Sequence, residues 1–227
     1  MSTTSDAPDL ARALAAEALG TALLVAGVVG SGIMAQGLTH DTALMLLCNT
    51  VATACLLVVL ILVFAPLSGA HFNPAVTLAL AARDGTTRGR VLSYIAAQIA
   101  GGVVGTVTAH AMYALPLLAP GATARHGSAQ LLSEAVAAFG LVLMIFALRP
   151  RGATIVAAAV GLYIAAAYWF TASTSFANPA VTIARALTPT FAGIRPMDAP
   201  AFIAAQLAGA GLAAALAVWL FPARNHT

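Results

Sequence analysis

The sequence has no lysine and carries little charge of either sign. Arginine supplies all ten of its Lys+Arg residues, acidic residues number seven, and charged residues make up only 7% of the chain. A soluble domain has about 25% charged residues. A chain with so few charges cannot cover its own surface in water, so a soluble domain is excluded and a lipid bilayer is the predicted surroundings. The arginines are scattered among predicted loops, which argues against nucleic acid as a partner despite an isoelectric point near 9.3.

Cysteine is equally scarce, with only Cys48 and Cys55 in the chain. These two residues fall seven apart in one apolar segment, so on a helix they are separated by about 10 Å along the axis. That distance is too long for a disulfide. The sequence also has no Cys/His metal spacing, and it has no Ser/His/Asp set, HExxH motif or phosphate loop. We therefore expect no metal, no cofactor and no enzymatic activity.

Long apolar runs fill most of the chain, which is 61% hydrophobic with a mean hydropathy of +0.94. A helix that spans a bilayer needs about 20 mostly apolar residues. The sequence predicts an all-α membrane protein with six such spans. They are Leu10–Ala35, Ala43–Ala65, Val91–Ala114, Ala129–Leu148, Ala153–Phe170 and Ala201–Phe221.

Two shorter apolar pieces, 73–82 and 178–187, follow the second and fifth spans, and both open with Asn-Pro-Ala-Val-Thr. Proline suits the first turn of a helix, and asparagine before it suits the N-cap. We predict two half-helices that meet in the membrane, the second ending near Leu187. Their positive N-terminal ends would repel cations and protons, while the asparagine amides donate to a passing oxygen. The motif residues are Asn73, Pro74, Ala75, Asn178, Pro179 and Ala180.

The two halves of the chain repeat each other around these motifs. Ala16-Glu17-Ala18 matches Ser133-Glu134-Ala135, and Tyr94–Gly101 matches Phe202–Gly209. Three spans per half give the halves opposite topology, and a functional site is expected where inverted repeats meet. We predict one domain over 1–227, with repeat one at about 10–114, a connecting loop at 115–128 and repeat two at about 129–221.

The arginines also predict the orientation. With the N-terminus inside, seven arginines face the cytoplasm, Arg224 among them, and only Arg125, Arg185 and Arg195 face outward. This asymmetry agrees with the positive-inside rule. Both termini are therefore expected in the cytoplasm.

Taken with their flanks, the paired motifs make the chain resemble the aquaporin family, the major intrinsic proteins. The resemblance covers nearly the whole chain and includes Ser68–Thr77, both glutamates in the spans, Gln98 and Gln206. It implies six tilted transmembrane helices, two re-entrant half-helices and a homotetramer with one pore per subunit. It also implies passive flow of water or small neutral solutes across a plasma (inner) membrane.

The chain departs from the family at the selectivity filter. Typical members have an arginine after the second Asn-Pro-Ala, where this chain has Val181; ungapped counting places the other filter positions at Thr53, Ala166 and Ser175. Such a filter is small, with no aromatic ring and no fixed charge, so it should be wider than a strict water filter. Glycerol-conducting relatives keep the arginine and add an aspartate, but Thr182 follows here.

We therefore favour a wide, aquaglyceroporin-like pore for water, glycerol-like solutes and metalloid hydroxides such as arsenite and antimonite, as in bacterial members of this valine-bearing type. An ordinary water channel is the alternative. A secondary active transporter is the alternative from another class, because inverted repeats also occur there. The half-helices, however, offer only asparagine and apolar residues where a coupled transporter needs titratable groups.

Several other polar residues leave two roles open. Glu17 and Glu134, acids in the membrane, are either proton carriers or, as their symmetry favours, acceptors for backbone donors around the half-helices. Arg185, one turn after Val181, either replaces the filter arginine or caps the half-helix and lines the outer vestibule. His71 is either a pH sensor at the inner mouth or a structural residue.

Tyr168, Trp169 and Trp219 are interpreted as interfacial anchors.

Overall fold

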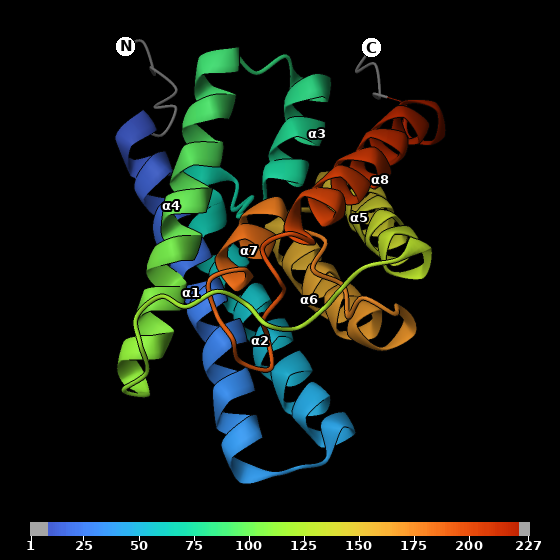
Figure 1. The fold of residues 1–227 in the computed structure, drawn as a ribbon. Coiled ribbons are helices and arrows are strands. Elements are labelled where there is room, and N and C mark those ends of the chain that lie inside the picture. Colours follow the sequence, from blue (N-terminus) through green and yellow to red (C-terminus); the bar gives the residue numbers. More distant parts are fainter. Residues whose placement is uncertain (1–8, 223–227) are drawn as a thin grey trace.

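The computed structural model describes residues 9–222, which form eight α-helices and one 3-10 turn (Figure 1). The residues before Asp9 lie outside the described range, and so does Arg224, which is predicted to face the cytoplasm. The elements are α1 (Leu10–Leu38), α2 (Thr42–Ser68), α3 (Pro74–Asp84), α4 (Arg88–Met112), α5 (Ser128–Leu148), η1 (Arg149–Arg151), α6 (Ala153–Phe170), α7 (Pro179–Arg185) and α8 (Ala199–Leu220).

Six of these helices are long and apolar enough to cross a membrane, which confirms the predicted spans. Each long helix begins and ends within a few residues of its predicted bounds. The two short helices, α3 and α7, begin at Pro74 and Pro179, as the motifs predict. Helix α7 ends at Arg185, slightly earlier than expected, because Ala186 and Leu187 turn back onto the carbonyls of the last helical turn.

The helices form two triplets joined by the half-helices. Helix α1 packs on α2 and α4, and α5 packs on α6 and α8 in the same way. Each half-helix lies against the third span of the other triplet, since α3 contacts α8 and α7 contacts α4. In Figure 1, α3 descends from the end where α1 begins, and α7 lies at the centre of the bundle. The inverted arrangement thus brings both half-helices together in the middle.

The outward surface of the bundle is apolar. Leu162 and Leu212 are exposed, as are Cys48 and Cys55, which are both free. Trp169 and Trp219 are exposed too and remain suited to the membrane interface. Tyr168 is not: its side chain is only 3% exposed and points into the bundle, so its interpretation as an anchor is wrong.

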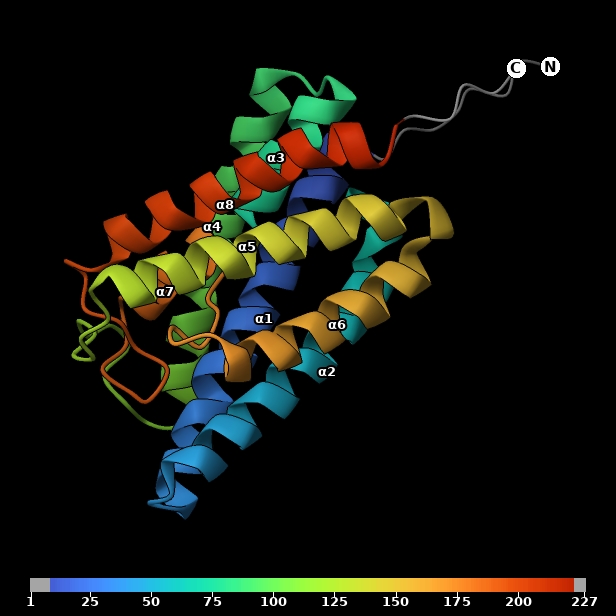
Figure 2. The ribbon, with the colours of Figure 1, turned by 90° about the vertical axis from the view of Figure 1, so that its right-hand side faces the viewer.

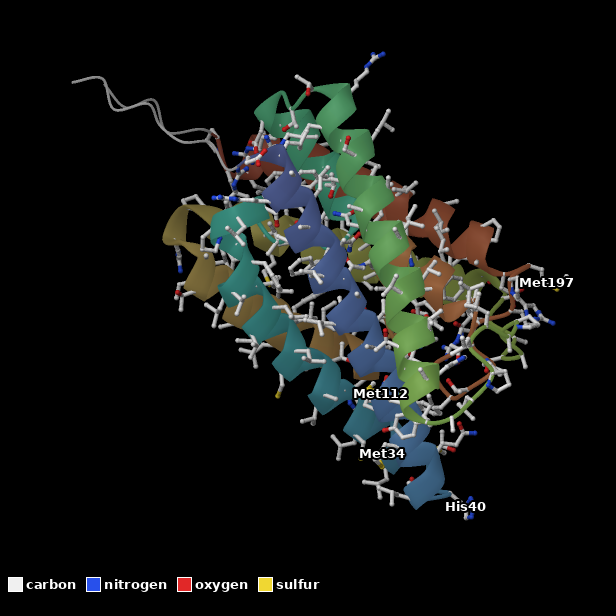
Figure 3. The ribbon with its side chains drawn as sticks, turned by 90° about the vertical axis from the view of Figure 1, so that its left-hand side faces the viewer. Met34, His40, Met112 and Met197 are labelled. Carbon is white, nitrogen blue, oxygen red and sulfur yellow. The ribbon has the colours of Figure 1, made fainter. Side chains whose placement is uncertain are left out.

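The two ends of the bundle differ. Helix α1 begins and α8 ends at the same end of the molecule (Figures 1 and 2). There Arg149 pairs with Asp84 at 2.6 Å, and Arg83 donates to the Phe221 carbonyl. Figure 3 shows His40 and Met112 at the opposite end, where α1 is joined to α2 and α4 terminates. At that end the connection between the halves crosses over α7, with Gly121 donating to the Ala186 carbonyl.

Glycines allow the closest helix contacts, at related positions in both halves. A Cβ at Gly101 of α4 would collide with the backbone of Ala18 in α1, and one at Gly209 of α8 would collide with the backbone of Ala135 in α5. Small residues at such crossings let helices approach in a bilayer, where burial of apolar surface gives no advantage. Gly211, two residues later in α8, has open space around it.

These two glycines of α8 give a matched test of the packing. Gly209→Ala should destabilise the protein by about 1–3 kcal/mol, because the added methyl group must displace backbone. Gly211→Ala should leave stability unchanged or raise it slightly, because alanine favours the helix. Thermal unfolding in detergent measures both, and equal melting temperatures for the two variants would contradict this account.

Candidate functional site

The N-terminal ends of the two half-helices meet at the centre of the protein and are bonded to each other. Asn73 donates through Nδ2 to the carbonyl of Ala177 at 2.8 Å, and Asn178 donates to the carbonyl of Phe72 at the same distance. Each asparagine therefore holds the loop that precedes the other half-helix. These two bonds join the loops of the two repeats directly.

Each asparagine also caps its own helix. Asn73 Oδ1 accepts from the Ala75 amide at 2.9 Å, and Asn178 Oδ1 accepts from Ala180 and Val181. Both side chains border the central cavity. An asparagine amide has two N–H groups, and one on each remains without a protein acceptor among residues 9–222. The geometry leaves two donors at the midpoint of the cavity, at the positive ends of two helices.

The loop before α3 is fixed by Glu17, which is fully buried. One carboxylate oxygen accepts from the Ser68 hydroxyl at 2.6 Å and the His71 amide at 2.9 Å. The other accepts from the Phe72 amide and from Gln98 Nε2, each at 2.7 Å. The carboxylate thus satisfies donors that no water or helix would satisfy at this depth.

Glu134, also fully buried, does the same for the loop before α7. Its oxygens accept from the amides of Phe176 and Ala177, each at 2.9 Å, and from Gln206 Nε2 at 2.6 Å. Through these contacts, both glutamates support the loops that precede the half-helices. No carboxylate lines the cavity among the residues that the structure describes.

The carboxylates hold strained backbone. Phe72 and Ala177 each lie in the left-handed region, with φ of 50° and 48°, and Ala70 and Ser175 do so as well. Such conformations cost about 1–3 kcal/mol each for residues other than glycine. The paired bonds to each glutamate offset this cost.

The central cavity has a volume of about 100 Å³ and mostly apolar walls. Leucine, isoleucine and valine side chains from α1, α2, α3, α5 and α6 supply most of the apolar lining. The loops before the half-helices also border the cavity. Its polar lining residues are Thr53, His71, Asn73, Tyr168, Ser175, Asn178 and Arg185.

Three of the four predicted filter residues line this cavity, namely Thr53, Ser175 and Val181, but Ala166 does not. Ala166 lies on the exposed face of α6. Tyr168 takes its place, with its hydroxyl 3.3 Å from Thr53 Oγ1. Ungapped counting from Asn178 thus gave a residue on the outward face of α6. The cavity contains an aromatic ring beside Thr53, contrary to the prediction.

The burial pattern of α6 distinguishes Tyr168 from Ala166. The buried positions of this helix repeat at helical spacing, and the set includes neither Ala166 nor Trp169. Because the span is almost entirely apolar, its sequence has no polar face that would have revealed this pattern. These buried residues are Ala157, Val160, Gly161, Ile164, Ala167 and Tyr168.

A second aromatic ring, Phe176, lines the cavity and contacts two arginines. The guanidinium carbon of Arg185 is 3.4 Å from the ring centroid, and that of Arg125 is 4.9 Å away. Arg125, from the loop that connects the repeats, also donates to the carbonyls of Gly193 and Ser173. Burial lowers the pKa of the Arg125 guanidinium, while the negative charge of Glu134 acts in the opposite direction. No local sequence pattern predicts this role for Arg125, which comes from a distant loop.

His71 lies toward the end of the cavity that is nearer to the start of α1. Its Nδ1 is 3.1 Å from the Thr77 hydroxyl, and its ring is tilted against Tyr94. The residue borders both the central cavity and a second, polar pocket near Asp84 and Arg90. The structure thus places His71 at one mouth of the cavity with a hydrogen-bond partner.

Comparisons with known proteins agree with this geometry. A profile of the family described as "Major intrinsic protein" matches residues 4–153. The chain is 58% identical to "Aquaglyceroporin AqpS" of Rhizobium meliloti (strain 1021), over 95% of this chain and 93% of that protein. It is 35% identical to "Probable aquaporin TIP-type" of Medicago truncatula, over 62% and 58% of the two chains. The fold matches the X-ray structure of the aquaglyceroporin from Plasmodium falciparum with a TM-score of 0.74 at 20% identity, covering 95% and 97%.

The supporting role of Glu17 predicts a large effect from a small change. Glu17→Gln should cost about 3 kcal/mol of stability, because an amide NH₂ would replace an oxygen that now accepts from two donors. Asp41→Asn, which alters an exposed N-cap on α2, is the control and should cost less than about 1 kcal/mol. Thermal unfolding in detergent compares them; a Glu17 variant as stable as the control would contradict the structural role.

Proposed function

The chain belongs to the major intrinsic protein family, and from this premise we propose that it is a passive transmembrane channel for water and small neutral solutes. The family is a channel family and not an enzymatic one. The observation that carries the proposal is the pair of asparagine amides in a cavity with mostly apolar walls. Such a path offers a few hydrogen bonds to a solute oxygen and weak contacts elsewhere, which suits fast, unassisted passage.

We further propose that the pore is of the wide, aquaglyceroporin-like kind. Val181 stands where typical members have an arginine, and Thr53 and Ser175 leave small side chains beside it. The high identity to a protein named an aquaglyceroporin supports glycerol-like solutes. Tyr168 narrows this filter relative to the sequence prediction, but its hydroxyl is held at Thr53, to one side.

Neutral metalloid hydroxides such as arsenite and antimonite are our proposed substrates within this class. They are uncharged near neutral pH, are of glycerol-like size, and present several hydroxyl groups to the donors of the cavity. The mixed lining, with apolar side chains and a few hydroxyl and amide groups, suits compact polyhydroxylated solutes.

An ordinary water channel and a secondary active transporter are the competing functions. The transporter is less favoured because the described cavity lining contains no carboxylate, and both buried glutamates are committed to backbone donors. A coupled transporter needs a titratable or ion-binding group in its path. We also propose a homotetramer in the plasma (inner) membrane with cytoplasmic termini, on the basis of the family and the arginine distribution.

Solute selectivity at Val181 is open to a direct test in proteoliposomes. Wild-type protein should conduct water, glycerol and arsenite, at rates that ignore proton and sodium gradients. Val181→Arg should reduce glycerol and arsenite flux several-fold more than water flux, since the added guanidinium narrows the constriction. A wild-type pore that passes water alone would refute the wide-pore proposal, and flux driven by an ion gradient would refute passive transport.

Tyr168 and its neighbour provide a second test of the same constriction. Tyr168→Ala should raise glycerol flux relative to water flux, because a ring is removed from the cavity wall. Trp169→Ala removes an exposed ring from the same helix and should leave the ratio unchanged. Stopped-flow light scattering on both variants gives the two rates, and equal ratios for both would place Tyr168 outside the constriction.

A further inference from the structure

We propose that Arg185 is the specificity-determining group of the outer pore, where it excludes cations and donates to solute oxygen. The inference rests on the proposed channel function and assigns its charge selectivity to a residue one helical turn beyond the filter position. Arg185 and Val181 are four residues apart on α7, and both line the cavity. The missing filter arginine thus has a counterpart on the same face of the same half-helix.

The guanidinium of Arg185 is held in a fixed orientation. It stacks 3.4 Å above the Phe176 ring, and its Nε donates to the carbonyl of Ala192. Phe176 is itself fixed, because its ring packs edge-on against Phe202 at 5.4 Å and its amide donates to Glu134. A planar guanidinium stacked in this way is presented as a rigid fork of donors.

The donors of this fork are available to a solute. Ala192 is the only protein acceptor for the Arg185 guanidinium within the described part of the chain, so both terminal nitrogens are left over. The Ser175 hydroxyl lines the same cavity, is buried, and has no hydrogen-bond partner among residues 9–222. The Arg185 fork and the Ser175 hydroxyl border the same cavity, so both can bond an oxygen-bearing solute there.

The two guanidinium groups at this point have no ion-pair partner among the described residues. Asp198 accepts from the backbone amide of Arg125, but its salt bridge is to the guanidinium of Arg195. The carboxylate of Glu134 is used by two backbone amides and Gln206. Two guanidinium groups over one ring therefore give the outer pore a positive potential that a cation must cross.

Urea and guanidinium ion are suitable probes, because they have nearly the same planar shape but differ in charge and in the presence of an oxygen. In wild-type proteoliposomes, uptake of labelled guanidinium should be at least about tenfold slower than that of urea. Arg185→Gln should raise guanidinium uptake, normalised to water permeability, at least about tenfold. Arg185→Lys keeps the charge and should keep guanidinium out.

Arg195→Gln is the matched control, because it removes the same charge from the same end of the protein without touching the cavity. It should match wild type for guanidinium. Equal uptake of urea and guanidinium by wild type, or unchanged exclusion in a water-conducting Arg185→Gln variant, would overturn the assignment. If wild-type vesicles are no more permeable to water than protein-free vesicles, the channel function itself fails, so the two failures are distinguishable.

Discussion

Two buried carboxylates determine whether this pore exists. Without Glu17 and Glu134, the loops before α3 and α7 would present backbone N–H groups to a region that has no water to satisfy them. Each carboxylate accepts from two consecutive or neighbouring amides and from one glutamine. Acids in a membrane usually indicate a titrating function, but here their oxygens are fully used in holding bent backbone. The rest of the site is positioned by these bends.

The half-helices can start in mid-membrane only because their ends are satisfied in several ways at once. Proline removes one donor from each first turn, and the asparagine side chain caps others. The remaining asparagine N–H groups then point to the cavity. The two charged elements of the path, the helix ends and Arg185, are both positive. A passing solute therefore meets donors and positive potential at two depths, and an apolar wall between them.

Most of the fold could be predicted from the sequence because its signals are local. A run of about 20 apolar residues specifies a span, and Asn-Pro at the start of a short run specifies a helix start. The internal repeat alone was enough to identify Glu17 and Glu134 as equivalent positions, and likewise Gln98 and Gln206. The filter was harder: Ala166 was assigned by counting back from Asn178, but α6 is so uniformly apolar that no polar face shows which residues turn inward, and Ala166 lies on the exposed side. Arg125 and Phe176 come from segments that are far apart in the sequence, so no local pattern predicts their contact.

The bonds between Asn73 and Ala177 and between Asn178 and Phe72 also bear on how the protein is made. Each repeat contributes a loop whose carbonyl is satisfied only by the asparagine of the other, and more than 100 residues separate the partners. During synthesis, the first half enters the membrane while its own half-helix still lacks this partner. The first repeat is therefore not a finished module. Helix α3 reaches its final hydrogen bonding only when the second half has inserted, which makes pore closure around the asparagines a late step of assembly.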